Sequence, residues 1–503
     1  MNRPRAAAPR ILSRALPCAA LCLLAGCAVG PNFEKPAAPK VNGYIAQPLV
    51  TTTATPNVAG GESQHFDMGA DLSGDWWTLF HSKQLNALIE QALANNHDLK
   101  AAQAALKVAH ENTLAQRGGY FPSVSAGFSA SREHDPGAAL APVPSNNAFL
   151  YNLYTPQLSI SYTPDVFGLN RRSVESLRAQ EQATRFQMLA TYTTLTSNVV
   201  VTAIQLASTQ AQIDATRELI AADTKMLTIL DYQSDKGYAS GLDVAGQQSQ
   251  LAQAKAALPP LIKQATQLQD QLSVLTGHFP GEMPPQPFRL ADLQLPQDLP
   301  VSLPSRLVEQ RPDVRQAQAN LHAASAQVGV AIANRFPAFT LSADKGSTAL
   351  AIADLFKAGT GFWNIAADIA APIFEGGTLK HQERAAKAAY TEASEQYKST
   401  VLTAFQNVAD TLNALQQDAD ALNAAAASER ANKTTLELAQ QQARDGYTSD
   451  LALLTAEQNY QQARIALITA QADRYADTAA LFQALGGGWW HRGDLDGNED
   501  DAK

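Results

Sequence analysis

The two halves of the chain repeat one plan at a spacing of about 210 residues. Asp98 lies 23 residues before Phe121 in the first half, and Asp313 lies 23 residues before Phe336 in the second. Residues 237–242 (GYASGL) also match residues 446–451 (GYTSDL). A duplicated architecture of this kind is typical of symmetric objects rather than of one asymmetric catalytic pocket.

Residues 1–26 have the features of a lipoprotein signal peptide. Four arginines precede a short apolar stretch at 15–25, which ends in Leu24-Ala25-Gly26-Cys27. This ending resembles a bacterial lipobox and predicts cleavage before Cys27, with diacylglycerol and a fatty acyl chain such as palmitate attached to that residue. Ala28 stands where an aspartate would favour retention in the inner membrane in many bacteria. We therefore expect a lipoprotein sorted to the outer membrane, and an ordinary signal peptide with an incidental cysteine is the alternative.

Cysteine usage and charge exclude several classes of function. All three cysteines lie in the signal or at its end, so the mature chain has no thiol pair for a disulfide, a redox site or a metal site. Removing the four arginines of the signal takes the formal net charge from −9 to −13, which argues against nucleic acid as a partner. The nine histidines are scattered without metal-binding spacing, and we expect no metal site and no cofactor beyond the lipid.

Four segments alternate polar and apolar residues with period two, which predicts strands with two different faces. No later stretch of 18 apolar residues exists, so a membrane crossing by the mature chain would need these strands. The apolar positions are Val124, Ala126, Phe128 and Ala130; Leu158, Ile160 and Tyr162; Phe339, Leu341 and Ala343; and Trp363, Ile365, Ala367 and Ile369.

Very long helices follow each pair of predicted strands. Residues 171–236 contain neither proline nor glycine, and a helix of that length would extend roughly 100 Å. Residues 378–445 are equally free of helix breakers. Each helix should turn at its Gly-Tyr signal and return as a second helix, ending near Leu275 and Leu485, with apolar residues at coiled-coil spacing. Pro259-Pro260 should bend or break the first returning helix.

These patterns divide the chain into six parts. Residues 494–501 carry five acidic residues, and a disordered acidic tail explains them better than a calcium loop, because the EF-hand spacing is absent. The parts are a signal peptide (1–26), a lipidated extended arm (27–82), a first repeat (83–277), a Pro-rich linker (278–300), a second repeat (301–488) and an acidic C-terminal tail (489–503).

Four strands cannot close a membrane-spanning sheet, because small barrels have eight or more. Every backbone polar group in lipid needs an internal partner, so the chain must share its barrel with copies of itself. The polar surfaces of the helices should then extend into an aqueous compartment. The predicted fold is mainly α with a membrane β-barrel portion, built from two structural repeats. The lipobox and the four alternating strands do not fit a soluble cytoplasmic coiled coil. A lipid-anchored periplasmic coiled-coil scaffold without a pore remains as the alternative.

Several motifs carry a family resemblance over nearly the whole mature chain. The chain is similar to outer membrane factors of the TolC/OprM type, in the NodT-like lipoprotein branch. This resemblance implies a homotrimer whose copies each give four strands and long helical hairpins to an α/β-barrel tunnel. The matching motifs are 29–33 (VGPNF), 76–80 (WWTLF), Ala92 with 96–99 (NHDL), 311–314 (RPDV) and 484–489 (ALGGGW).

The resemblance also implies a role and partners. Such a protein is the passive exit duct of a tripartite efflux system in the outer membrane, with a periplasmic helical tunnel and no catalysis. It receives substrate from an inner-membrane pump of the resistance-nodulation-division class and a periplasmic adaptor (a membrane fusion protein). The adaptor would contact the hairpin tips around Gly237, Tyr238, Gly446 and Tyr447. Charged residues near those tips are candidates for a periplasmic gate, although a solvated turn explains them as well: Asp243, Arg444, Asp445 and Asp450.

Overall fold

The computed structural model describes residues 28–47, 49–134, 136, 149–282, 288–448 and 450–493, without the side chains of Asp450 and Leu451. The predicted signal, Cys27 and the acidic residues from Asp494 onward lie outside the described residues. The chain forms two compact units, each assembled from separate stretches. The first unit contains Met1–Lys35, Lys107–Gln182 and Gln318–Gln396, and the second contains Pro36–Leu106, Ala183–Ala317 and Tyr397–Lys503.

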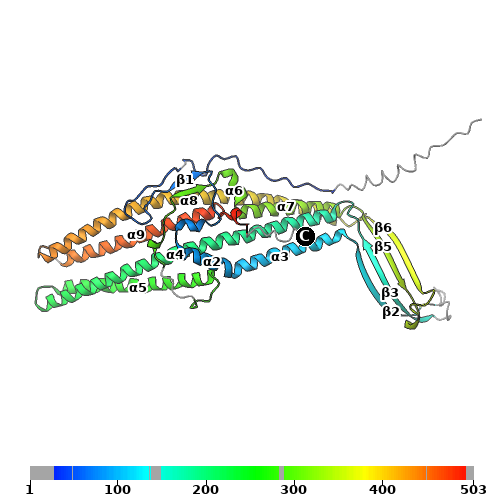
Figure 1. Ribbon diagram of the computed structural model, residues 1–503, viewed down its shortest axis with the longest axis horizontal. Coiled ribbons are helices and arrows are strands. Elements are labelled where there is room, and N and C mark those ends of the chain that lie inside the picture. The colour runs from blue at the N-terminus through cyan, green and yellow to red at the C-terminus, as the bar shows by residue number, and fades with distance from the viewer. Residues whose placement is uncertain are drawn as a thin grey trace, which may run out of the picture. The chain divides into compact units, whose positions relative to one another are not determined.

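The first unit contains an antiparallel sheet in the order β2-β3-β5-β6 (Figure 1). The strands are β2 (Ser123–His134), β3 (Leu150–Tyr162), β5 (Ala338–Ser347) and β6 (Gly361–Ala370). The central pairing of β3 with β5 joins the two halves of the chain, from Tyr162 opposite Leu341 to Gln157 opposite Gly346. The four strands predicted from the sequence are confirmed, and β3 begins several residues earlier than its alternation suggested.

The register gives the sheet one apolar and one polar face. Residues directly opposite each other point to the same face, and Val124 pairs with Ile160, Ile160 with Ala343, and Ala343 with Ile365. The other face carries Ser125, Ser159 and their neighbours. The apolar side chains are largely exposed, and Ile365 is 74% accessible. This sheet therefore presents an uncovered apolar surface.

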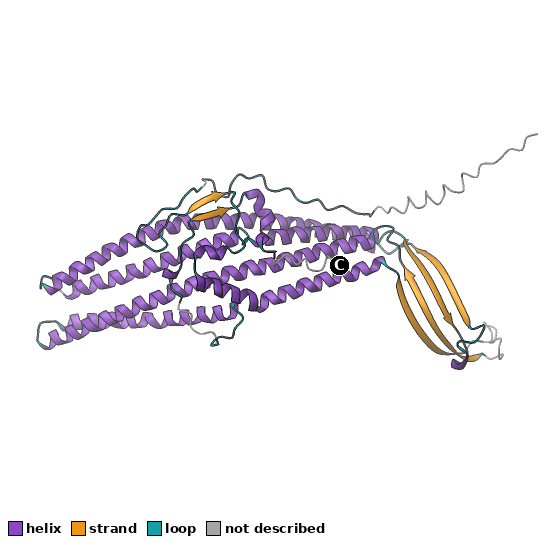
Figure 2. Ribbon diagram, in the orientation of Figure 1, coloured by secondary structure: helices purple, strands orange, loops and turns teal. Residues whose placement is uncertain are grey.

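Two very long helices follow the strand pairs, as predicted. Helix α4 (Leu169–Asp235) and helix α8 (Thr378–Arg444) each have 67 residues (Figure 2). Helix α4 starts where the Asp165 carboxylate accepts hydrogen bonds from the backbone N–H groups of Asn170 and Arg171, at 2.9 and 2.8 Å. An aspartate that satisfies free N–H groups at a helix start stabilises that start.

The helical stretch from Lys83 to Arg117 is two helices. Helix α2 (Lys83–Asn95) ends at Asn96, and helix α3 (His97–Arg117) begins immediately after it. Asn96 leaves the helical conformation, with ψ at 128°, and its side-chain oxygen accepts from the N–H of Leu99 at 2.9 Å. The asparagine cap therefore separates the two helices, although the spacing of apolar residues continues from one helix into the next.

The second unit contains two helical hairpins. Helix α5 (Gly241–Leu275) returns beside α4, and helix α9 (Asp450–Ala484) returns beside α8 (Figure 1). The coiled-coil seam predicted along α8 is buried, except for Phe405, which contacts the ring of Tyr44 at a centroid distance of 5.5 Å. The buried seam residues are Val401, Val408, Leu412, Leu415, Ala419, Leu422 and Ala426. Of the helices in the described part of the chain, none is both long enough and apolar enough to span a bilayer.

The sequence predicted that Pro259-Pro260 would bend or break the first returning helix, and the helix is not broken there. Helix α5 continues without interruption through both prolines. Each proline removes one backbone N–H donor, so the carbonyl oxygens one turn earlier lose their partners. Water can donate hydrogen bonds to these carbonyl oxygens in place of the missing N–H groups. The residues concerned are all exposed: Lys255, Ala256, Pro259 and Pro260. Solvent on this side of the helix makes the prolines tolerable.

The N-terminal arm is more ordered than the predicted extended segment. Strand β1 (His65–Met68) pairs in parallel with strand β4 (Asp298–Val301), which lies at the end of the predicted linker. The arm also supplies Trp76 and Phe80, both fully buried, to an aromatic core around Phe482. The remaining helical segments are α6 (Pro304–Gln310), α7 (Pro312–Ala333) and the 3-10 turns η1 (Trp76–Phe80), η2 (Gly118–Tyr120), η3 (Leu290–Asp292), η4 (Ile352–Asp354) and η5 (Trp489–His491).

Three glycines follow the end of α9, near Leu485, where the sequence predicted that the helix would end. Gly486, Gly487 and Gly488 all have positive φ angles, and a Cβ atom on Gly488 would lie 2.2 Å from the carbonyl oxygen of Ser73. We expect Gly488→Ala to lower the free energy of unfolding by about 2 kcal/mol or more, because it adds both backbone strain and a clash. Gly493→Ala is the matched control, since its Cβ would meet no atom within 4 Å. Equal midpoints of denaturation for both variants would contradict this expectation.

Candidate functional site

The hairpin turns have the geometry that their Gly-Tyr signals predicted. Gly237 and Gly446 adopt φ angles of 79° and 77°, and each is followed by a tyrosine whose N–H donates to a carbonyl five residues back, at 2.8 Å. This arrangement is a helix C-cap that needs glycine. Tyr238 and Tyr447 are 84% and 85% exposed, so both turns present an aromatic ring to solvent. Whether an adaptor binds these rings stays a prediction.

The gate candidates occupy two separate turns. Asp243 completes a capping box at the start of α5: its carboxylate accepts from the N–H and the hydroxyl of Ser240, at 3.1 and 2.7 Å. The Ser240 hydroxyl and N–H hold the pKa of Asp243 below its usual value. A helix cap therefore explains Asp243 without any gate. Its role in a gate stays untested.

The other gate candidates belong to the second turn. The Arg444 Nε donates to the carbonyl of Gln440 at 3.2 Å, in the last turn of α8, where a cation favours the helix dipole. Asp445 follows within the turn, and Asp450 is the first residue of α9, although its side chain lies outside the description. The fold brings these three residues to one turn, as the sequence implied.

A buried polar layer in the same hairpins was not foreseen from the sequence. Gln247 of α5 is fully buried and donates from Nε2 to the backbone oxygen and Oδ1 of Asp223 in α4, at 2.9 and 3.2 Å. Gln461 of α9 is 4% exposed, and within the described residues its buried Oε1 atom has no hydrogen-bond partner. Both glutamines stand at seam positions that are usually apolar, one heptad or less from Leu251 and Leu454. A polar residue at such a position was the sequence signal that could have predicted the layer.

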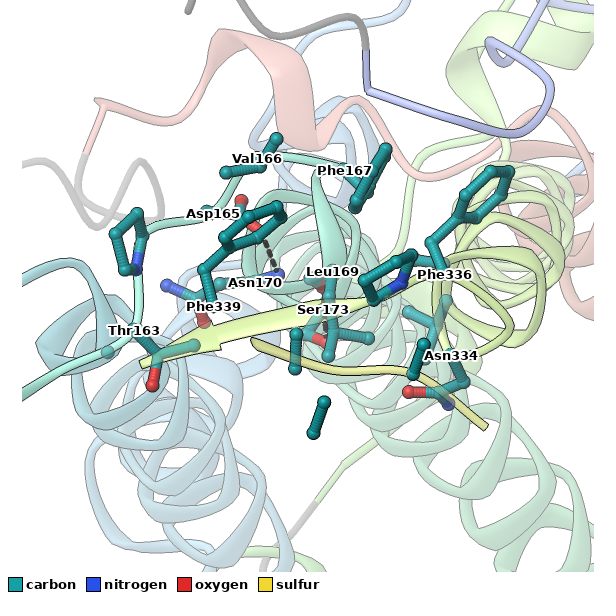
Figure 3. A pocket seen from close by; sticks show the side chains of 18 of the residues that line it. Thr163, Asp165, Val166, Phe167, Leu169, Asn170, Ser173, Asn334, Phe336 and Phe339 are labelled. Atoms are coloured by element: carbon teal, nitrogen blue, oxygen red, sulfur yellow. Dashed lines mark hydrogen bonds between the residues drawn. The ribbon is translucent and has the colours of Figure 1, made fainter. Parts of the chain in front are cut away.

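A recess lies where the strands meet the helices of the first unit (Figure 3). Its volume is about 800 Å³. Phe167 and Phe336 stack within it at a centroid distance of 4.7 Å, and Asp165 and Asn170 supply its polar groups. Labelled lining residues in Figure 3 include Thr163, Val166, Leu169, Ser173, Asn334 and Phe339.

The first described residues are bound next to this recess. Arg172, almost fully buried, donates to the carbonyl oxygens of Val29 and Gly30 at 3.1 and 3.3 Å, and to the Asn32 side chain at 2.9 Å. The N–H of Val29 donates to the carbonyl of Phe167 at 3.1 Å. We call this set of contacts the N-terminal clamp.

Two further features complete the N-terminal clamp. Phe33 stacks on His322 at 4.3 Å, and His322 and Arg172 both contact Glu175, at 3.0 and 2.7 Å. Burial acts to raise the pKa of Glu175, but hydrogen bonds from Arg172 and His322 hold it below its usual value. A Cβ on Gly30 would lie 2.5 Å from the Cα of Gly329, so only glycine fits there. These contacts explain the glycine, the asparagine and the phenylalanine of the VGPNF motif.

A family model for outer membrane efflux proteins matches residues 88–278 and 303–487. The chain belongs to the outer membrane efflux protein family. It is 30% identical, over 476 residues, to the probable efflux pump outer membrane protein TtgC of Pseudomonas putida, covering 93% of this chain and 94% of that one.

Solved structures agree with the family assignment. The outer-membrane channel OprN superposes with a TM-score of 0.78 at 26% identity, covering 92% of this chain and 100% of that chain. The open state of the Neisseria gonorrhoeae outer membrane channel MtrE gives 0.74 at 25% identity, covering 92% and 98%. This efflux protein therefore has the fold of the TolC-like channels and acts in the outer membrane as an exit duct.

The N-terminal clamp of this efflux protein depends on Arg172. We expect Arg172→Ala to speed hydrogen exchange of the amides at 28–33 by about tenfold or more, because hydrogen bonds to a charged group contribute about 1.5–3 kcal/mol. Arg178→Ala, an exposed arginine on the same helix, is the control. Unchanged exchange in Arg172→Ala would show that stacking and packing hold the segment without the guanidinium.

Proposed function

We propose that the protein is the exit duct of a tripartite efflux system and works as a homotrimer, as a passive conduit without catalysis. The observation that carries this proposal is the two-faced sheet. One face is mostly apolar and exposed, with Lys345 between Leu158 and Trp363 as a charged exception, and the other carries serine, threonine, asparagine and aspartate. A lipid-facing surface on one side and a water-filled lumen on the other require this division.

The edges of the sheet support a trimer. Within the described residues, β2 and β6 each have a neighbour on one side only. Unpaired backbone groups at such edges cost several kcal/mol each in lipid, about the cost of burying an unbonded amide. Pairing β6 of one copy with β2 of the next satisfies both edges, and three copies reach twelve strands, enough to enclose a channel. A scaffold without a pore gives no reason for an exposed apolar face of this kind.

The partners follow from the same division of surfaces. The hairpins carry polar and charged residues on their outer surfaces and lie outside the apolar sheet, so we assign them to the periplasm. The exposed Tyr238 and Tyr447 at their turns provide the contact for a periplasmic adaptor, and the adaptor connects the duct to a pump of the resistance-nodulation-division class. The relatives named as efflux pump outer membrane proteins support this assignment. The residues that close the periplasmic gate, Arg444 and Asp445 among them, stay candidates.

The N-terminal clamp supports lipid anchoring at Cys27. A Cβ on Gly168 would meet the Cβ of Ala28 at 2.7 Å, so Ala28 lies against the loop that follows β3. Consecutive Cα atoms are about 3.8 Å apart. A lipid on the preceding residue would therefore begin close to the base of the apolar sheet, where acyl chains can enter the outer membrane.

The duct is tested with charges placed on the two faces of β6. Ile365→Lys puts a cation on the apolar face and should cost about 2–4 kcal/mol near the middle of the bilayer. We expect it to abolish trimers in the outer membrane fraction. Asn364→Lys, the matched control on the polar face, should leave trimers by mass measurement in mild detergent and ion conductance in planar bilayers. A conducting monomer, or equal effects of the two variants, would reject the proposal.

Lipid anchoring is tested at the predicted acceptor. Cys27→Ser should prevent acylation and leave a precursor with its signal attached, because the modification requires the sulfur. Metabolic labelling with a radioactive fatty acid and the electrophoretic mobility of the protein are the measurements. A normally processed and labelled Cys27→Ser protein would show that the lipobox is assigned incorrectly.

A further inference from the structure

The two faces of the sheet in the first unit carry charges of opposite sign. Within the described strands, the apolar face carries the cationic side chains of Lys345 and Arg132 and no carboxylate. The opposite face carries the carboxylates of Glu133, Asp344 and Asp368, and neither lysine nor arginine. A cation on the apolar face therefore has no acidic neighbour on its own side of the sheet.

Lys345 lies among the apolar side chains of this face. Leu158 and Trp363 stand directly opposite it on the two neighbouring strands, and Trp363 is 75% exposed. Lys345 is itself exposed, and within the described residues it has no ion-pair partner. An unpaired cation on a lipid-facing strand destabilises a membrane protein, most of all near the middle of the bilayer. An anion from outside the chain would remove this cost.

The position of Lys345 along β5 indicates the side of the membrane that it meets. Helix α7 ends at Ala333, just before β5, so the Ala338 end of the strand is the end next to the helices. Lys345 stands six residues beyond Phe339, which is about 20 Å along the strand and about 15 Å of height at a tilt of about 40°. The apolar band of such sheets is about 25 Å tall. The long lysine stem can therefore carry its ammonium to the outer headgroups.

An apolar groove of about 350 Å³ lies on the same face, next to Lys345. This volume is within the range of small-ligand sites. Ala343 and Ala367 provide the space, because their side chains are shorter than those opposite them on the neighbouring strands. Ala343 stands two residues before Lys345 on β5, so the groove begins beside the cation and extends toward the helices. The other apolar side chains of the lining are Ile160, Tyr162, Leu341 and Ile365.

The groove stays accessible when copies of the chain assemble. Its residues belong to β3, β5 and β6, which lie side by side in the sheet (Figure 1). Strands of neighbouring copies pair at the sheet edges, in the plane of the backbone hydrogen bonds, and side chains stand out of that plane. The groove and Lys345 therefore both face the surroundings of the trimer.

We propose that the groove and Lys345 bind a phosphate-bearing glycolipid of the outer leaflet, the lipid A part of lipopolysaccharide, with an acyl chain in the groove and a phosphate on the lysine ammonium. The proposal rests on the exit-duct function only in that this function places the sheet in the outer membrane. The apolar groove beside a single cation matches an amphiphile with an anionic head. The outer position of Lys345 selects the outer leaflet, where lipopolysaccharide is the main lipid.

Binding is measured by native mass spectrometry of the purified trimer with added lipid A. We expect one lipid A per chain, and we expect Lys345→Gln to weaken its binding about tenfold or more, because a charge-assisted hydrogen bond is lost. Lys345→Arg keeps the cation and should retain the lipid. Lys380→Gln, at an exposed lysine of α8, is the matched control and should bind as the wild type does. Equal binding by wild type and Lys345→Gln, or no binding by wild type, would overturn the proposal.

A larger side chain in the groove tests the place of the acyl chain. Ala343→Leu should weaken lipid A binding about fourfold or more, which is the loss for each methylene that is displaced from apolar contact. Ala130→Leu is the matched control, since Ala130 lies on the same face of the sheet but outside the groove. The same affinity in both leucine variants would contradict the proposed site.

Phosphatidylglycerol tests the choice of lipid. Its phosphate diester carries one negative charge, whereas a phosphate monoester of lipid A carries close to two, so we expect it to bind about threefold or more weakly. Equal affinities of the two lipids for the wild type would reject lipid A as the occupant.

Conductance in planar bilayers separates the lipid site from the duct. A trimer that conducts, but whose lipid A binding does not depend on Lys345, would keep the duct and reject the site. A protein that binds lipid A through Lys345 but never conducts would keep the site and reject the duct.

Discussion

The register between β3 and β5 is the constraint on which the membrane-facing part of this protein depends. This pairing joins the two repeats into one sheet, and it aligns Ile160 with Ala343 so that the apolar residues of both halves share one face. A slip of one residue would turn every side chain of one repeat to the opposite face. Apolar and polar residues would then mix on both faces of the sheet, so neither face would suit contact with lipid alone or with water alone. The duplicated sequence therefore functions only in this alignment.

The N-terminal segment is a structural part of both units. In the first unit the N-terminal clamp binds it through Arg172. In the second unit Arg474, fully buried on α9, donates to the Thr52 hydroxyl and to the carbonyl of Glu62, at 2.9 and 2.6 Å. A buried cation is costly without such partners. The arm therefore compensates a charge in the helical core, and its order follows from long-range contacts.

Sequence patterns predicted the helices and strands well where buried and exposed residues alternate with a regular period. The four strands, the two 67-residue helices and the glycine turns are all present. The patterns were less informative where a single position decided the local structure. Exposed Pro259 and Pro260 remain inside α5, and Asn96 separates two helices whose apolar spacing is continuous. Asp243, a gate candidate by its charge, also completes a helix cap, and its role in a gate stays a prediction.

By itself the sequence determined the duplication, the two faces of each strand, the hairpin turns and the family, because these are local or periodic properties. The tertiary structure alone decided which distant groups meet. The clamp joins Val29 to Arg172, and an ion pair joins Glu218 of α4 to Arg464 of α9, more than 200 residues apart in the chain. Burial and neighbouring charge set the protonation of such groups, and neither is visible until helices from both repeats are packed side by side.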